Sequence, residues 1–140
     1  MSRVILLAAD RPLPLLEPAF RRGRCTGRFT VETDGFSVRP HEYYRGAVDE
    51  LGLELKPFQY ELDLEATQED VNALRAYLAG HCRPGEQVEL WNLWVGVDRE
   101  DQVPHFQGEL ADLALDTLEQ LCFPPVERDC PGQCRLTVTI

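Results

Sequence analysis

The chain has few of the residues from which catalytic sites and membrane-spanning segments are built. Its 140 residues include two serines, three histidines and one lysine. Long apolar runs are missing as well, since the run from Val4 to Ala9 has six residues and Asp10 follows it directly. Such a run is too short for the core of a signal peptide and far too short to cross a bilayer. We therefore expect a cytoplasmic protein without a membrane anchor.

A standard cysteine motif is also lacking, although the chain holds five cysteines. In "CPGQC", three residues separate Cys130 from Cys134, whereas zinc knuckles and thioredoxin-like redox sites use two. The cluster motif of radical S-adenosylmethionine enzymes needs a further cysteine where this chain has Thr137. We interpret Pro131-Gly132 as the centre of a tight turn, and we predict neither a metal nor another cofactor.

A looser zinc site is the alternative for the thiols. It would make the chain a zinc-stabilised module, and it could recruit Cys122, Cys82, His81 or His105. Cysteine pairs without standard spacing are weak evidence for a metal. We therefore expect Cys25, Cys82 and Cys122 to be small buried hydrophobic side chains.

The segment "RRGRCTGR" carries four arginines around Cys25. Neighbouring positive charge favours a thiolate, but a cysteine nucleophile also needs an imidazole, and the sequence places none beside Cys25. We therefore predict no catalytic residue. The segment is expected to form an exposed loop whose arginines pair with the chain's own carboxylates, and a loop that binds an anion is the alternative.

Negative charge dominates the second part of the chain. Residues 1–45 hold eight arginines against five Asp and Glu, a charge of +3, whereas residues 46–140 carry −13, which gives −10 in total. An acidic surface repels nucleic acid and anionic membranes and attracts basic proteins. We therefore expect no nucleic-acid or membrane partner. Another protein with a basic surface is favoured as the partner, and a homodimer remains open.

The first 55 residues predict a strand, a hairpin and a helix. Residues 3–9 are nearly all apolar, as in a strand that is buried on both faces. In residues 29–38, Asp34-Gly35 is a strong turn signal between alternating positions, which predicts a hairpin. Residues 40–52 predict a helix with Pro40 in its first turn, and its apolar face is formed by Tyr44, Ala47, Val48 and Leu51.

From about residue 56 the predicted order of elements is β-α-β-β-α-β. The strands are expected at 58–65, 88–97, 105–110 and 134–140, with helices at 68–82, capped by Thr67, and at 116–122. This order is typical of a ferredoxin-like fold, in which an antiparallel sheet carries its helices on one face. We therefore predict one α+β domain over residues 1–140, in which residues 1–55 extend a ferredoxin-like unit.

The strand at 88–97 is unusual for such a unit because both of its faces are apolar. One face carries Trp94 and the other carries Trp91. In the ferredoxin-like strand order this strand would lie at an edge, where apolar faces are normally avoided. We expect the N-terminal 55 residues to cover the second face, and residues 3–9 could pair alongside this strand. A partner subunit is the alternative cover.

Carboxylates form the most coherent polar pattern. Three of them alternate along one face of the strand at 58–65, and three more lie in the turn after the strand at 88–97. Such a row is usually a solvated face, and its functional interpretation is a docking surface for a basic partner. We therefore predict a non-enzymatic, acidic protein-interaction module, of the immunity type or a regulatory subunit. Its expected partner-binding residues are Glu61, Asp63, Glu65, Trp91, Trp94, Asp98, Glu100 and Asp101.

The alternative function is that of a small enzyme or a small-ligand-binding protein. Its pocket would lie between the sheet and the N-terminal segment, lined by His41, Tyr43, Tyr44 and Trp91. That alternative requires a pocket with a titratable group of shifted pKa, whereas an interaction module would present an open surface.

Overall fold

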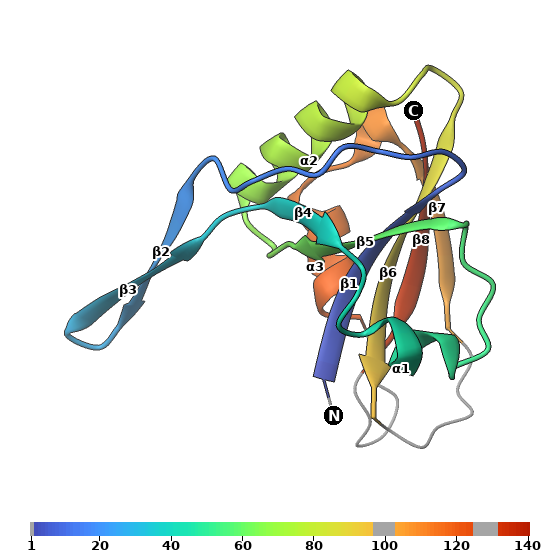
Figure 1. Cartoon of the computed structure of the whole chain (residues 1–140). Helices are drawn as coiled ribbons and strands as arrows, with labels where there is room; N and C mark the ends of the chain where they lie inside the picture. The colour runs from blue at the N-terminus through green and yellow to red at the C-terminus, as the bar shows by residue number, and fades with distance from the viewer. Residues whose placement is uncertain (1, 97–102, 125–131) are drawn as a thin grey trace.

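A computed structural model describes residues 2–96, 103–124 and 132–140 (Figure 1). In chain order the elements are β1 (Ser2–Ala9), β2 (Arg21–Thr26), β3 (Phe29–Asp34), β4 (Ser37–Pro40), α1 (Arg45–Asp49), β5 (Phe58–Asp63), α2 (Gln68–His81), β6 (Gln87–Val95), β7 (His105–Glu109), the 3-10 helix η1 (Leu110–Asp112), α3 (Leu115–Cys122) and β8 (Cys134–Thr139). Six strands form one sheet in the order β4-β5-β1-β6-β8-β7, and β2 and β3 form a second, two-stranded sheet. Neighbouring strands are antiparallel except β7 and β8, which are parallel. The predicted α+β fold with a mostly antiparallel sheet is therefore confirmed.

Strand β1 lies in the middle of the six-stranded sheet. It pairs with β5 along one edge and with β6 along the other, and its residues 4–9 are buried. Ile5 and Leu7 face one apolar cluster, whereas Val4 and Leu6 face the other. The predicted strand with two buried faces is confirmed, and its central position removes the most apolar surface from water.

The ferredoxin-like strand order is not confirmed. That order would place β5 between β7 and β8 and leave β6 at an edge, whereas the structure inserts β1 between β5 and β6 and places β8 on the other side of β6. The reason is the apolar character of both faces of β1 and β6, since two such strands bury more surface side by side in the centre than at an edge. Within residues 1–55, β1 and β4 are therefore strands of the main sheet, whereas β2 and β3 form the separate two-stranded sheet.

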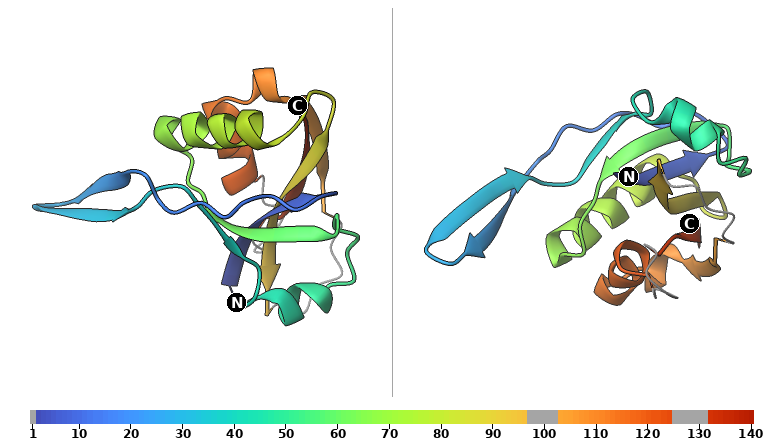
Figure 2. Two further views of the ribbon diagram at one scale, coloured as in Figure 1. Left: turned by 45° about the horizontal axis from the view of Figure 1, so that its top comes forward. Right: turned by 90° about the horizontal axis from the view of Figure 1, so that it is seen from below.

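Helices α2 and α3 cover one face of the sheet, and the short helix α1 lies against the other face (Figures 1 and 2). Helix α2 begins as predicted, because the Thr67 side chain accepts a hydrogen bond from the backbone N–H of Asp70 at 3.1 Å. Its predicted apolar stripe of Val71, Leu74 and Leu78 is buried against the sheet. This larger cluster also takes up Phe36, which precedes β4.

The second face of β6 is covered from within the chain, as predicted. Trp91 and Leu93 pack with Val48 of α1, and partly buried apolar side chains of residues 44–55 surround them. The expected helical face of Tyr44, Ala47, Val48 and Leu51 does pack here, but the helix is shorter than predicted. Pro40, expected in the first turn of this helix, is instead the last residue of β4, which pairs with β5.

The predicted hairpin turn at Asp34-Gly35 is wrong. The hairpin consists of β2 and β3, and its two-residue turn is Gly27-Arg28, with Gly27 at φ +64°. A turn of this kind requires positive φ at its first position, which glycine adopts without steric cost. Asp34 is the last residue of β3, and Gly35 begins the short connection to β4. The chain therefore runs from the hairpin into the main sheet at this point.

Candidate interaction site

The β2–β3 hairpin, called the arm from here on (residues 21–34), projects away from the body of the molecule (Figures 1 and 2). Every residue of β3 is exposed, and Arg22 is the one buried residue of β2. Strands of six residues extend about 20 Å, so the arm tip lies far from its base. No arm residue belongs to either apolar cluster of the described chain. The arm therefore adds reach to the molecule without adding to its core.

Arg22 fixes the base of the arm. Its side chain is only 7% exposed, and its Nε and Nη2 donate to the two carboxylate oxygens of Asp70 at 2.9 and 2.5 Å. Its Nη1 donates to the carbonyl of Asp34 at 2.7 Å and to Oδ1 of Asp63 at 3.0 Å. Asp70 is fully buried in the first turn of α2 and also accepts a hydrogen bond from the Thr67 hydroxyl. The arm is thus tied to the start of α2 through paired charges.

The electrostatics of this anchor favour the charged state. Burial alone would lower the pKa of the Arg22 guanidinium, but the hydrogen bonds to Asp70 and Asp63 outweigh burial and hold that pKa above its ordinary value. Breaking a buried ion pair is costly because the surviving charge is left without a partner. The base of the arm is therefore held firmly even though little apolar surface is buried there.

Gly35 lets the two chain segments at the arm base come close together. Its N–H donates to the Phe20 carbonyl at 2.8 Å. A Cβ atom at position 35 would lie 2.6 Å from the Phe20 ring and 2.7 Å from the Phe20 carbonyl oxygen. Phe20 itself packs at the margin of the larger apolar cluster. This contact sets the point at which the arm leaves the body.

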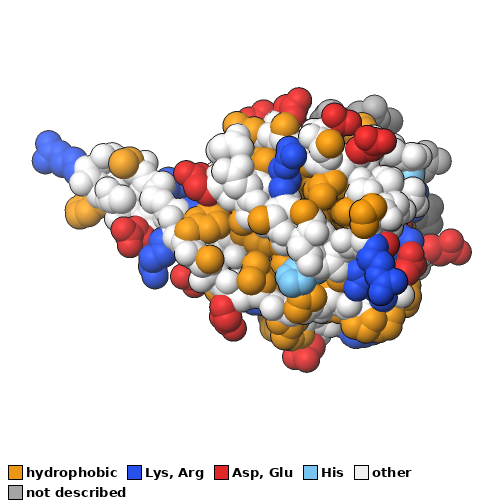
Figure 3. All heavy atoms as spheres, turned by 90° about the horizontal axis from the view of Figure 1, so that it is seen from above, with side chains coloured by type: hydrophobic (Ala, Val, Ile, Leu, Met, Phe, Trp, Pro, Cys, Tyr) orange, Lys and Arg blue, Asp and Glu red, His pale blue; other side chains and the backbone are white. Residues whose placement is uncertain are grey.

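The two faces of the arm differ in character. Residues that pair across an antiparallel hairpin share a face, so Arg24 lies beside Val31 and Thr26 beside Phe29. Phe29 is 76% exposed and Val31 is 47% exposed. We call the side of the arm that carries Phe29 and Val31, with their neighbours Arg24 and Thr26, the apolar face of the arm. Figure 3 shows the arm standing clear of the body, with positive charge at its end and apolar side chains close behind.

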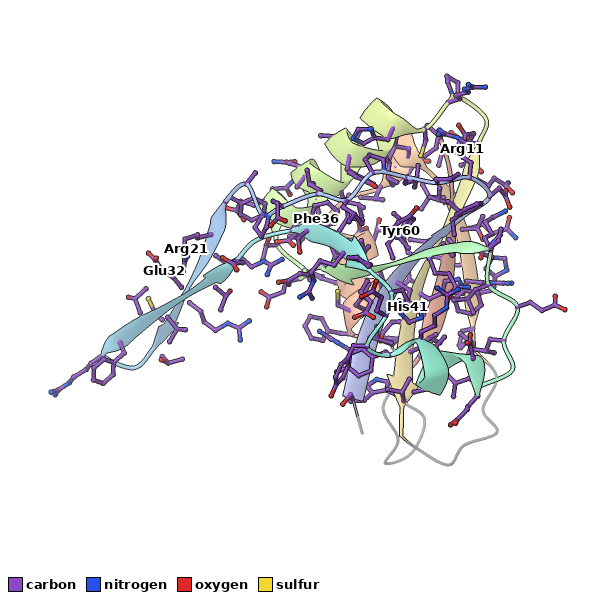
Figure 4. The ribbon with its side chains drawn as sticks, viewed as in Figure 1. Arg11, Arg21, Glu32, Phe36, His41 and Tyr60 are labelled. Atoms are coloured by element: carbon purple, nitrogen blue, oxygen red, sulfur yellow. The ribbon has the colours of Figure 1, made fainter. Side chains whose placement is uncertain are left out.

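The opposite face of the arm is polar. Arg21 forms salt bridges with Glu32 at 3.3 Å and with Asp34 at 3.6 Å (Figure 4). Cys25 lies beside Thr30 on this face and is exposed, so the expectation of a buried Cys25 is wrong. The sequence contained one signal for the arm, a glycine at the first position of a two-residue turn between two six-residue strands.

The carboxylates expected on an open strand face are bound within the chain. Glu61 contacts the buried His41 ring, with Oε2 2.9 Å from Nδ1, and its side chain is 12% exposed. Asp63 is bonded to Arg22, and Glu65 lies 3.7 Å from Arg22 and 3.6 Å from Arg24. Arg21, Arg22 and Arg24 pair with the chain's own carboxylates, as expected, but their segment forms strand β2 and the turn into β3 and is not the expected loop. A partner would meet these carboxylates only in competition with the side chains that already contact them.

The other predicted partner-binding residues are divided between the core, the surface and the residues outside the description. Trp91 is buried, donates from Nε1 to Glu89 at 3.3 Å and has the guanidinium of Arg135 5.2 Å from its ring centroid. Trp94 is half-buried on the opposite face of β6. The remaining three, Asp98, Glu100 and Asp101, lie outside the described residues.

The four residues of the alternative pocket do not converge on one cavity of the described chain. His41 is fully buried beside Glu61 (Figure 4), whereas Tyr43 is 86% exposed and Trp91 is in the core. Tyr44 borders an open hollow of about 280 Å³ with Glu61, Arg39 and Arg3 among its lining residues. Half of the residues that line the hollow are charged, unlike the mainly apolar lining typical of small-ligand sites.

The described cysteines are separate thiols. Cys82, Cys122 and Cys134 are buried, as predicted for the first two, and burial raises the pKa of the Cys122 and Cys134 thiols to about 11. Such thiols are protonated and unreactive at neutral pH. Cys130, with its Pro131 neighbour, lies outside the described residues. Among residues 2–96, 103–124 and 132–140, no three His, Cys, Asp or Glu side chains come together as metal ligands would.

Comparisons with protein-family models, with curated proteins and with solved structures find no match to this chain. None of the helices in the described part of the chain is both long enough and apolar enough to cross a membrane. The functional argument therefore rests on the geometry of the arm and on the charge of the body.

Proposed function

We propose that the chain is a non-enzymatic protein-interaction module that holds another protein through its arm and its acidic body. The observation that carries the proposal is the apolar face of the arm, with Phe29 and Val31 exposed on a hairpin whose base is fixed by the buried Arg22–Asp70 pair. An exposed aromatic ring on a fixed projection loses little conformational freedom when it is covered, which makes it an efficient contact residue.

The distribution of charge supports a basic partner surface. The arm holds four arginines against Glu32 and Asp34, a charge of +2, so the remainder of the chain carries −12. An acidic body of this kind steers basic surfaces toward it and repels nucleic acid. Trp94 and the acidic residues at positions 98, 100 and 101 belong to the proposed surface. A cytoplasmic immunity-type protein or a regulatory subunit fits this profile.

In-cell photo-crosslinking tests the proposal. A photo-reactive phenylalanine analogue is placed at position 29, and the same analogue at position 43 serves as the control, because Tyr43 is also exposed but lies in the body. We expect position 29 to give a protein adduct that position 43 does not give, and when the irradiation is repeated in lysate we expect high salt to reduce its yield. If position 29 gives no protein adduct, or if both positions give the same one, the proposal is wrong.

A further inference from the structure

A second surface of the molecule matches the arm in chemistry. Where the start of α2 approaches α3, an open hollow of about 590 Å³ is lined by Ala66, Asp116, Glu119, Gln120 and Phe123. Phe123 is 70% exposed, so an exposed aromatic ring lines the hollow. We call these five residues the α3 hollow. Its lining combines the apolar side chains of Ala66 and Phe123 with two carboxylates.

The arm and the α3 hollow are complementary in both charge and apolarity. The apolar face of the arm offers Phe29 and Val31, and Arg28 in the turn adds a positive charge at the tip. Arg24 on the same face adds a second positive charge, although its guanidinium also lies 3.6 Å from Glu65 of its own chain. The hollow offers Phe123 together with the negative charges of Asp116 and Glu119. Aromatic rings pack favourably on each other, and opposite charges around them fix the register.

The arm cannot occupy the α3 hollow of its own chain. Figures 1 and 2 show the arm pointing away from α3 and from the body. Its base is fixed in that direction by the Arg22 hydrogen bonds and by the close approach of Gly35 to Phe20. A surface that fits the arm but lies beyond its reach within one molecule is available in a second molecule.

We infer that the partner of the arm is a second copy of this chain, and that two copies exchange arms so that each apolar face lies in the α3 hollow of the other. This inference rests on the proposed function and names the basic surface as the arm itself. Reciprocal exchange follows from the size of the contact, because the four residues of the arm face are few beside the roughly 20–30 residues per side of a standard interface, and twofold symmetry provides the contact twice. Two bodies of net negative charge repel each other elsewhere, so association is confined to the arms.

A charge exchange tests the inference. The arm variant carries Arg24→Glu and Arg28→Glu, and the hollow variant carries Asp116→Lys and Glu119→Lys. Each variant alone opposes like charges in both contacts of a homodimer, whereas the mixture restores opposite charges in both contacts of a heterodimer. Sedimentation equilibrium at low salt, over a range of protein concentrations, measures the association.

We expect the wild-type chain to form a reversible, salt-sensitive dimer, each variant alone to be a monomer, and their equimolar mixture to form a 1:1 heterodimer. Phe29→Ser should raise the dimer dissociation constant at least about tenfold, while the matched control Tyr43→Ser leaves it unchanged. Circular dichroism verifies that each variant is folded. If the double hollow variant is unfolded, Glu119→Lys alone takes its place.

Three results would overturn the inference: a wild-type chain that stays monomeric at high concentration and low salt, a hollow variant that dimerises like the wild type, or a mixture that stays monomeric. These results are separable from a failure of the proposed function. Suppose that position 29 gives an adduct to a different protein and the wild-type chain is monomeric. That result would overturn only the inference that the partner is a second copy, and the proposed function would stand. The absence of any adduct overturns both.

Discussion

At the scale of single residues, Arg22 forms the buried ion pair with Asp70 that fixes the base of the arm. Replacing it in Arg22→Met keeps most of the side-chain volume but leaves the fully buried Asp70 carboxylate without its cation. We expect the free energy of unfolding to fall by about 3–5 kcal/mol. Urea denaturation followed by circular dichroism measures this change.

The neighbouring Arg21→Met provides the matched control. Arg21 is 60% exposed and its salt bridges are on the surface, so its loss should cost at most about 1 kcal/mol. Equal losses of stability in the two variants would contradict the role assigned to the buried pair.

The thiols of Cys122 and Cys134 predict a pH dependence. Burial raises the pKa of both to about 11, whereas an unfolded cysteine titrates near 9. The folded state therefore holds more protons than the unfolded state between these values, and the stability present below pH 9 is lost as the pH rises toward 11. We expect the Cys122→Ala/Cys134→Ala variant to lose stability less steeply in this window, by on the order of 1–3 kcal/mol per thiol. Urea unfolding at several pH values measures both slopes, and parallel slopes would disprove the assignment.

At the scale of elements, the exit of the arm depends on the absence of a side chain at position 35. Gly35→Ala places a Cβ against both the ring and the carbonyl oxygen of Phe20, so we expect a loss of about 1–3 kcal/mol of unfolding free energy. Gly23→Ala is the matched control within the arm, because a Cβ there meets no atom within 4 Å. Thermal unfolding of the two variants compares them. A Gly35→Ala variant as stable as Gly23→Ala would show that the close approach does not fix the arm.

Elements with a regular pattern could be predicted from the sequence, and the arm could not. The alternation of residues 58–65 and the cap at Thr67 predicted β5 and α2, because local pattern and local hydrogen bonding act together there. In the arm, exposed strand residues follow no apolar alternation, and Asp34-Gly35 is as good a turn signal as the turn that forms. The burial of Arg22 depends on Asp70, which is distant in sequence, so no local pattern reveals it.

At the scale of the whole molecule, strand order was the property that the sequence did not predict. Elements from residue 58 onward follow the expected succession, but the order of strands depends on which of them bury both faces. The apolar faces of β6 indicated a covered position, and the cover was predicted to come from the first 55 residues. The sequence suggested that residues 3–9 could pair alongside β6, which they do, but it did not show that β5 would pair with the other edge of β1, because pairing between distant segments leaves no local trace.

The sheet centre and the arm should also differ in hydrogen exchange. Backbone amides of β1 and β6 are paired between two buried layers, so we expect them to exchange only through global unfolding. Amides of residues 21–34 are paired in a two-stranded, exposed sheet and should exchange much faster. Exchange measured by mass spectrometry at low and high protein concentration tests this and the proposed dimer together. Arm exchange should slow at high concentration, and concentration-independent exchange would count against arm pairing.

The central position of β1 has a consequence for synthesis of the chain. Leu6 of β1 pairs with Trp91 of β6, so β1 emerges from the ribosome long before β6, the strand that pairs along one of its edges, has been synthesised. At roughly 5–20 residues per second, translation of the intervening segment takes on the order of 4–17 seconds. During that interval a strand with two apolar faces has no neighbour on that edge of the sheet. Nascent chains of this protein should therefore be clients for a ribosome-associated chaperone until β6 has emerged.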